Sequence, residues 1–262
     1  MLKKRLVPKL LIRHRQVGAT MRPVLVTTRG FAESIEVGDP VSQAKIYEAQ
    51  MADELIVLNI EGTPIAGNTM MLDLIARLAS ETFMPLTVGG GVRSAADFAT
   101  LLASGADKVA INQAALDRPA LIAEAAVRYG AQVVVVSIDY RIVDGRPQVF
   151  THSGAEPTGL TPLDWARRAT DEGAGEILLT NADRDGTGAG LDIPVGAEIA
   201  AALPIPVILS GGCGLAAHFS DGFLTGGAEA VAAGTYFCFR DQNPFQTRSQ
   251  IRNAGIAIRM EI

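Results

Sequence analysis

Cysteine and histidine are scarce in this chain of 262 residues. Two cysteines, Cys213 and Cys238, are too few for a disulfide framework or a thiolate metal site, and they fit a reduced compartment. The three histidines, His14, His152 and His218, lack the H-E-x-x-H spacing of a zinc site. We therefore expect packing cysteines, no metal and no cofactor.

Long apolar runs and blocks of like charge are also missing. No run approaches the ~20 residues of a membrane span, and Pro8 and Arg13 interrupt the only apolar stretch near the N-terminus. A net charge of −5, spread along the chain, argues against nucleic acid but leaves room for a phosphorylated small molecule. We expect a cytoplasmic protein with no membrane partner.

An internal repeat at a constant lag is the strongest signal that is present. Three segments recur 121 or 122 residues later: Pro85–Gly91 as Pro206–Gly212, Gly105–Ala110 as Gly227–Ala232, and Glu54–Asn59 as Glu176–Asn181. A lag near half the length indicates a duplicated half. Extending the comparison towards the start of the chain gives Asp139 a leucine, Leu11, as its counterpart.

Short apolar runs alternate with segments of helical period, which is typical of parallel β/α units. The expected strands are Leu6–Ile12, Leu55–Ile60, Leu86–Val88, Lys108–Ile111, Val133–Ile138, Ile177–Thr180, Val207–Ser210 and Ala230–Ala233. The expected helices cover 41–52, 68–82, 94–104, 118–129, 161–173, 192–202, 215–225 and 243–254, with Ser94, Thr161 and Asp192 among the caps. This predicts a single α/β domain over 1–262, a (βα)8 TIM barrel of two half-barrels, about 1–130 and 131–262.

Two connections are too long for plain turns. They run from Arg13 to Asp39 and from Arg141 to Thr158, at equivalent places in the repeat. Both follow barrel strands, so we expect them on the C-terminal rim, where barrels carry their chemistry. The first, with Thr27–Gly30, is expected to be a mobile lid.

Glycines end the third and seventh strands, and a small or polar residue ends the strand after each. Glycine lets a backbone approach a ligand closely, which suits phosphate. The two predicted phosphate sites comprise Gly89, Gly90, Gly91 and Asn112 in one half, and Gly211, Gly212, Gly234 and Thr235 in the other. The alternative is that these glycines only close tight turns.

Asp183–Thr187 follows the sixth strand and is the densest polar cluster of the chain. A carboxylate, a guanidinium and a hydroxyl at a strand end can hold a sugar phosphate, with Thr180, Asp185 and Gly186 as the contacts we expect. A solvated loop is the alternative.

With these motifs in place, the chain resembles the cyclase subunit of imidazole glycerol phosphate synthase over nearly its whole length. The segments that carry the resemblance are Met1–Arg5, Gly38–Pro40, Asp53–Leu55, Thr87–Gly91, Gly105–Val109, Ile138–Asp139, Gly173–Thr180, Asp183–Thr187 and Ser210–Gly212. The resemblance implies a barrel that receives ammonia from a HisH-type glutaminase subunit, in a heterodimer, and carries it to a substrate with two phosphates. Imidazole glycerol phosphate and an aminoimidazole carboxamide nucleotide would be the products.

The resemblance also implies an ammonia gate of four charged residues at the base of the barrel. Arg5, Glu54, Lys108 and Glu176 match all four positions. Two positive and two negative groups can neutralise one another there, and the alternative is an ion-pair layer with no gating role. Asp107 and Gln132 match positions that face the glutaminase.

At the catalytic positions the chain departs from the family. Asp139 matches the general acid, but Leu11 stands where the family has its general base and can neither accept nor donate a proton. The family's lysine after the first strand is replaced by Ala19 or Thr20, and the acidic residue that ends the second strand is Asn59.

Alternate residues of a barrel strand face the same way, so Arg5 at the gate places Lys9 inside the barrel, on the ammonia channel. A buried ammonium must pair, lose its proton or reach solvent, and Asp139 is the partner we expect. A shift of the first strand that turns Lys9 outward is the alternative.

These departures favour a paralogue that conducts ammonia, with cyclase activity weak or absent. Some barrels that resemble this one, and also lack the first-strand aspartate, work with a glutaminase in the amination of surface-polysaccharide sugars. A barrel of that kind would pass ammonia on, so a third, amidating enzyme is a further expected partner. The competing hypothesis is an authentic synthase in which His14 or His152 replaces the base. The isomerase of the preceding pathway step fits least, because it also needs the first-strand aspartate.

Overall fold

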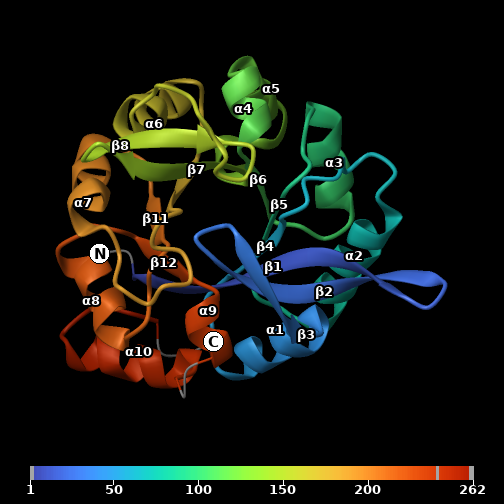
Figure 1. Cartoon of the computed structure of the whole chain (residues 1–262), viewed down its shortest axis with the longest axis horizontal. Coiled ribbons are helices and arrows are strands. Elements are labelled where there is room, and N and C mark those ends of the chain that lie inside the picture. Colours follow the sequence, from blue (N-terminus) through green and yellow to red (C-terminus); the bar gives the residue numbers. More distant parts are fainter. Residues whose placement is uncertain (1–2, 240–241, 260–262) are drawn as a thin grey trace.

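Eight parallel strands close into a barrel in the computed structural model, which describes residues 3–239 and 242–259 (Figure 1). Met1 and Leu2, the start of the first family segment, lie outside the described residues. The barrel strands, in order around the barrel, are β1 (Arg5–Val17), β4 (Leu55–Asn59), β5 (Leu86–Gly89), β6 (Lys108–Ile111), β7 (Val134–Val143), β10 (Glu176–Asn181), β11 (Val207–Ser210) and β12 (Ala230–Ala233). Pairing of β12 with β1, and of β7 with β10, closes the cylinder.

The predicted (βα)8 fold is confirmed, and every expected strand is present. Three strands, β6, β11 and β12, have the expected bounds. Parallel strands buried on both faces are continuous apolar runs, which is why composition alone located them.

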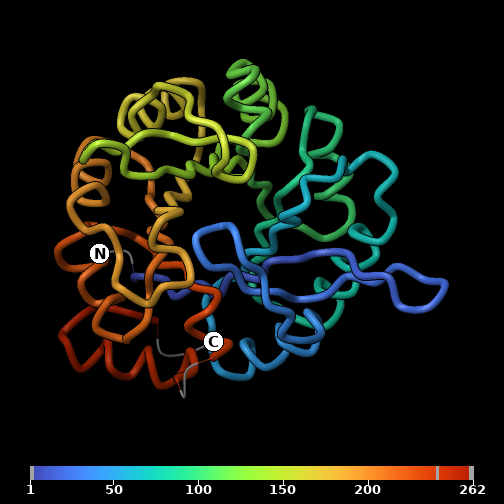
Figure 2. Tube along the Cα trace, viewed as in Figure 1, coloured from blue at the N-terminus to red at the C-terminus, as the bar shows by residue number. Residues whose placement is uncertain are grey.

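Helices follow the barrel strands and form the outer layer that surrounds the barrel (Figures 1 and 2). The helices of four or more residues are α1 (Pro40–Ala49), α2 (Thr69–Glu81), α3 (Ala95–Ala103), α4 (Gln113–Asp117), α5 (Ala120–Tyr129), α6 (Pro162–Asp171), α7 (Ile193–Ala202), α8 (Ala216–Leu224), α9 (Thr235–Phe239) and α10 (Pro244–Asn253). The short α4 and α9 were not expected.

All three expected cap residues occupy N-cap positions, and two of them make the side-chain cap bond. Ser94 accepts a hydrogen bond from the Asp97 N–H, and Thr161 accepts one from the Asp164 N–H. Asp192 occupies the N-cap position of α7, as expected, but its side chain makes no cap hydrogen bond. Its carboxylate instead accepts from the Asn181 side-chain amide at 2.9 Å, which ties the end of β10 to the start of α7.

Two hydrophobic cores follow from the barrel. The larger lies between strands and helices, and Leu6, Leu10 and Ile12 of β1 belong to it. The smaller fills the barrel interior, and Val7 of the same strand belongs to that one. Alternation along β1 therefore assigns each residue to the helix side or to the barrel axis.

Both long connections are folded into antiparallel strands instead of forming a loop. Beyond Ile12, β1 pairs with β2 (Thr20–Arg29), which pairs with β3 (Glu33–Gly38). We call Arg13–Gly38 the rim ribbon. Its far turn projects from the barrel on the right of Figure 1, while the turn between β2 and β3 lies over the centre. In the second half, β7 continues into β8 (Arg146–Thr151) and β9 (Glu156–Pro157).

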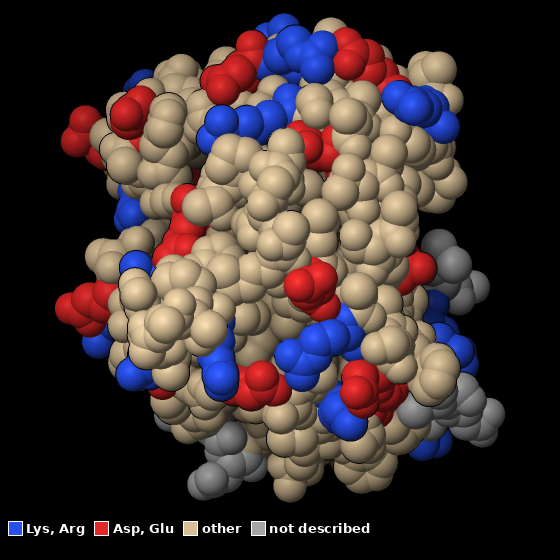
Figure 3. Space-filling model, turned by 90° about the vertical axis from the view of Figure 1, so that its right-hand side faces the viewer, with Lys and Arg blue, Asp and Glu red and all other residues tan. Residues whose placement is uncertain are grey.

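Lysines, arginines and carboxylates are interspersed on the face of Figure 3, with neither sign covering it. Within residues 3–239 and 242–259, no helix is long and apolar enough to cross a membrane. In the same ranges no three His, Cys, Asp or Glu residues are grouped so as to hold a metal ion.

Candidate functional site

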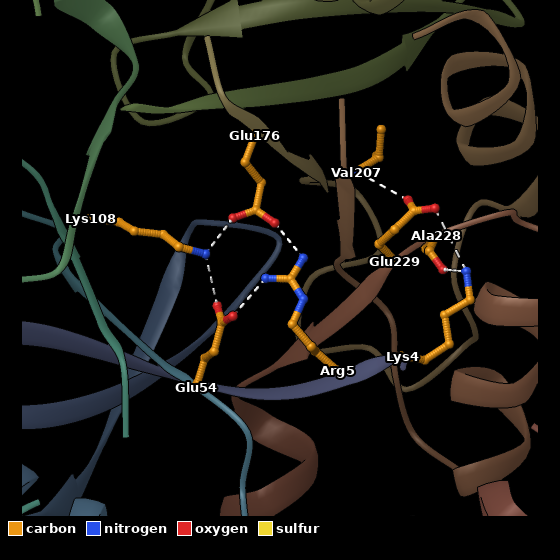
Figure 4. A network of polar contacts seen from close by, with 8 residues as sticks. All are labelled: Lys4, Arg5, Glu54, Lys108, Glu176, Val207, Ala228 and Glu229. Carbon is orange, nitrogen blue, oxygen red and sulfur yellow. Dashed lines mark hydrogen bonds and ion pairs between the residues drawn. The ribbon is translucent and has the colours of Figure 1, made fainter. Parts of the chain in front are cut away.

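Four charged side chains form a closed ring at the base of the barrel (Figure 4). Arg5 donates to Glu54 Oε1 at 2.7 Å and to Glu176 Oε1. Lys108 donates to Glu54 Oε2 at 3.2 Å and to Glu176 Oε2 at 2.9 Å. Each of the four carboxylate oxygens therefore has one cationic partner, and the ring has no net charge.

Electrostatics favour this closed arrangement. Burial alone would lower the pKa of Arg5, but the nearby Glu176 and Glu54 carboxylates outweigh it and raise that pKa above its ordinary value. Breaking a buried pair leaves an uncompensated charge, so the ring members hold one another in place. The arrangement can act as a gate only if one of these pairs opens.

The positions expected to face a glutaminase lie on the same end of the barrel. Asp107 directly precedes Lys108, is exposed, and accepts the Leu86 N–H at 2.7 Å. Gln132 is exposed next to the start of β7. Both side chains are accessible, and their role in docking stays a prediction.

Apolar side chains fill the barrel above the ring. The interior cluster comprises Val7, Ile56, Ala110, Val135, Leu178, Ile208, Ala230 and Ala232, with Leu58 packed against it. Val7, Ala110 and Leu178 stand two residues after Arg5, Lys108 and Glu176, as the expected parity requires.

Lys9 lies inside the barrel, two residues above Val7, and is only 5% exposed. Its ammonium donates to Ser210 Oγ at 3.0 Å and lies 3.6 Å from Asp185 Oδ1. The prediction that Lys9 pairs with Asp139 was therefore wrong. Asp139 lies on β7, directly across the barrel from β1, whereas Ser210 ends β11 and the Asp185 loop follows β10.

A small cavity of about 10 Å³ lies beside Lys9 at the mouth. Its lining brings together six of the predicted ligand contacts: Asp185, Gly186, Gly211, Gly212, Gly234 and Thr235. Ser210, Cys213 and Tyr236 also line it and were not predicted. Thr180 lies beside Ser210 in the β10–β11 register but not among the lining residues.

Steric demand explains several of the glycines without any ligand. Gly90 and Gly211 have φ near +91°, and a Cβ there would lie 2.1 Å from Asn59 O and 2.4 Å from Asn181 O, respectively. These contacts are equivalent in the repeat. A Cβ on Gly91 would meet Thr63 O at 1.9 Å, and one on Gly89 would meet Ala110 at 2.8 Å.

The first-half contacts are arranged differently from those of the second half. Asn112, which directly follows β6, donates a hydrogen bond from its side-chain amide to Asp139 Oδ2 at 2.7 Å. Its Oδ1 is buried without a partner among the described residues. Asn112 therefore positions Asp139 and has one acceptor left for a ligand.

Asp139 is partly buried at the end of the barrel part of β7. Burial raises its pKa to about 6, while the Lys9 ammonium and the Asn112 amide act in the opposite direction. A carboxyl group with a pKa near neutrality can exchange a proton with a bound ligand. This geometry fits the predicted general acid.

Leu11 lies on the strand opposite Asp139 and faces the same way as Lys9. It pairs in register with Leu58 of β4 and Val26 of β2, and is 7% exposed. This side of the mouth is thus apolar. Asn59 at the end of β4 is buried and donates to Thr63 Oγ1 at 2.7 Å, so its side chain stabilises the loop that follows β4.

Some residues of the Asp183–Thr187 cluster stabilise their own loop, and others line the cavity. Arg184 donates to the Gly190 and Leu191 carbonyls at 3.1 Å, and Thr187 donates to Arg184 O. Only Asp185 and Gly186 reach the cavity. The idea that the guanidinium and hydroxyl of this cluster hold a sugar phosphate is not supported.

The rim ribbon is fastened across the mouth to this loop. Thr28 Oγ1 donates to Asp185 Oδ2 at 2.5 Å, and Gly30 N donates to Asp185 O at 2.8 Å. Arg141 donates to the Gly30 and Gly154 carbonyls, each at 2.9 Å, and to Asp183 at 2.7 Å. The contacts of Thr28 and Arg141 were not predicted, since contacts between distant loops leave no periodic signal.

Other nucleophiles and bases near the mouth are poor candidates. Burial raises the pKa of the Cys213 thiol, so it packs as a neutral group. His14 has the parity of Ile12, away from Lys9, and its Nδ1 lies 2.5 Å from Glu61 Oε2. His152 is exposed and lies 3.3 Å from Glu156.

Comparisons with known proteins agree with this geometry. The family described as histidine biosynthesis protein matches residues 6–243. A "Putative imidazole glycerol phosphate synthase subunit hisF2" of Prochlorococcus marinus (strain MIT 9313) is 47% identical over 262 residues, covering all of both chains. An "Imidazole glycerol phosphate synthase subunit HisF" of Hyphomonas neptunium (strain ATCC 15444) is 44% identical over 259 residues, 99% of each chain.

Proposed function

Because the chain belongs to the histidine biosynthesis protein family, as a HisF-type barrel, we propose that it receives ammonia from a HisH-type glutaminase and conducts it to a phosphate-binding mouth. Cyclisation in histidine biosynthesis is weak or absent. One observation carries the proposal: the ring of Arg5, Glu54, Lys108 and Glu176 is complete, whereas Leu11 occupies the strand facing Asp139.

The chemistry explains why this combination matters. Ring closure to an imidazole needs proton transfers at two places, and a single carboxyl group supplies only one. Asp139 has a pKa of about 6 and can serve as the acid, but Leu11 offers no base. Ammonia transfer needs only a gate and a path, so it does not depend on Leu11.

The residues that line the mouth favour binding of a phosphorylated ligand. Glycine turns after β11 and β12 line one cavity, and glycine backbone suits phosphate because it lets the ligand approach closely. The accessible side chains of Asp107 and Gln132 beside the ring support docking of the glutaminase at the base of the barrel. A third, amidating enzyme would take up the ammonia if the mouth does not consume it.

Co-purification and isotope tracing test this proposal. The chain is mixed with the HisH-type glutaminase encoded in the same genome, and glutamine labelled with nitrogen-15 in its amide is supplied. We expect a complex and labelled ammonium that depends on both chains. No complex at micromolar concentrations would contradict the proposal.

A second candidate function, the authentic cyclase subunit, is favoured by the name of the Hyphomonas relative, "Imidazole glycerol phosphate synthase subunit HisF". It requires a base other than Leu11. His14 with its Glu61 partner is the better of the two histidines, although it faces away from the barrel interior. A His14→Gln variant that loses cyclisation while the wild type retains it would establish this alternative.

A further inference from the structure

Among the described residues that line the mouth cavity, Lys9 is the one cation and Asp185 the one anion. The Lys9 side chain starts on β1 and reaches Ser210 at the end of β11, two strands away around the barrel, and Asp185 in the loop after β10, three strands away. It therefore extends along the cavity wall, between the apolar interior and the glycine turns.

The partners of the Lys9 ammonium are incomplete. An ammonium carries three N–H donors, and within the described part of the chain it has a hydrogen bond to Ser210 and an ion pair to Asp185. The 3.6 Å to Asp185 exceeds hydrogen-bond distance. A buried ammonium with spare donors beside a cavity is well placed to bind an anion, because charge-assisted bonds are strong in such surroundings.

Asp185 competes with any such anion. Its Oδ2 accepts from Thr28 and its Oδ1 faces Lys9, so the carboxylate is shared between the rim ribbon and the cavity. The cavity of about 10 Å³ has room for a group the size of a water molecule. A phosphate must therefore displace the Asp185 carboxylate from Lys9 and widen the pocket.

We propose that Lys9 is a specificity-determining residue of the mouth: its ammonium, which pairs with Asp185 when no ligand is bound, recognises a phosphate group of the ligand. This inference rests on the proposed phosphate-binding mouth and adds to it a charged residue that the glycine turns do not supply. Uncharged ligands would leave Lys9 with Asp185 and gain nothing from it.

Calorimetric titration with inorganic phosphate at constant ionic strength tests the proposal on the full chain. Lys9→Met should weaken phosphate binding by about ten- to a hundredfold, as expected for loss of a hydrogen bond to a charged group. Lys45→Met is the matched control, since Lys45 is exposed and paired with Glu81 on the outer helices. Asp185→Asn should bind phosphate more tightly than the wild type.

Each outcome decides a separate point. Equal affinity of the wild type and Lys9→Met, with both folded by circular dichroism, would overturn the role of Lys9 and leave the phosphate mouth standing. Absence of phosphate binding to the wild type at millimolar concentration would overturn both. If Lys9→Met does not fold, Lys9→Arg retains the charge and must retain binding, and its failure to bind would count against the proposal.

Discussion

The Asn112 amide donates a 2.7 Å hydrogen bond to the carboxylate of Asp139 from the neighbouring strand. This bond favours the charged carboxylate, as does the Lys9 ammonium, yet burial outweighs both and raises the pKa of Asp139 to about 6. Asp139 is thus held by its neighbours while remaining able to carry a proton near neutral pH.

The raised pKa predicts a dependence of stability on pH. Protonated Asp139 stabilises the fold below its ordinary pKa of 3.8, and this contribution is lost as the pH rises through about 6. Relative to Asp139→Asn, the wild type should therefore lose about 1–2 kcal/mol between pH 4 and pH 7, allowing for partial exposure. Urea unfolding of both proteins across this range measures the difference, and parallel curves would refute the prediction.

Removing one charge from the ring should destabilise the barrel. Glu176 accepts from both Arg5 and Lys108 and is nearly buried, so Glu176→Gln leaves two cations with one carboxylate. We expect a loss of about 2–4 kcal/mol in the free energy of unfolding. Glu81→Gln, which breaks the solvent-exposed pair with Lys45, should lower the free energy of unfolding far less, because water screens such pairs. Similar losses in both variants would show that the ring contributes no more than a surface pair.

Gly90 should tolerate alanine poorly even without a ligand. Its φ of +91° opposes a side chain, and so does the Asn59 carbonyl oxygen, which would lie 2.1 Å from an added Cβ. Gly90→Ala should lower the free energy of unfolding by about 3 kcal/mol or more. Gly145 also has a positive φ but open space around it, so Gly145→Ala should cost only about 1 kcal/mol. The reverse order would remove the steric explanation.

Arg141 should slow the opening of the rim ribbon. Its guanidinium donates to the carbonyls of Gly30 and Gly154 and to the Asp183 carboxylate. Arg141→Met therefore removes these hydrogen bonds from the turns at Gly30 and Gly154. Hydrogen exchange of residues 28–32 and 152–156 should become faster, while exchange in β11 stays unchanged. Arg146→Met, at an exposed position of β8, serves as the control. Unaltered exchange in Arg141→Met would show that strand pairing and the bonds to Asp185 hold the ribbon without Arg141.

The barrel could be predicted from the sequence because buried parallel strands are short, continuous apolar runs. Lys108–Ile111 and Ala230–Ala233 were located to the residue for that reason. The rim ribbon could not, since Pro23 argues against a strand. Pro23 is tolerated where β2 pairs with β1 alone, before the pairing with β3 begins at Leu25.

The candidate site was predictable in its members but not in its contacts. Strand parity correctly placed Lys9 in the interior, because alternation is local to one strand. Its partner depends on how far the side chain reaches around the barrel and on the path of the Asp185 loop, which no spacing in the sequence records. Likewise, Arg184 matched a family motif but braces its own loop.

Cyclisation by the purified wild type is the measurement that tests the central claim most directly. With ammonium salt and the synthase substrate, we expect no imidazole glycerol phosphate from the wild type or from Leu11→Asn, and detectable product from Leu11→Asp, which restores a carboxylate opposite Asp139. Clear turnover by the wild type would contradict the claim that Leu11 separates this barrel from the cyclase reaction.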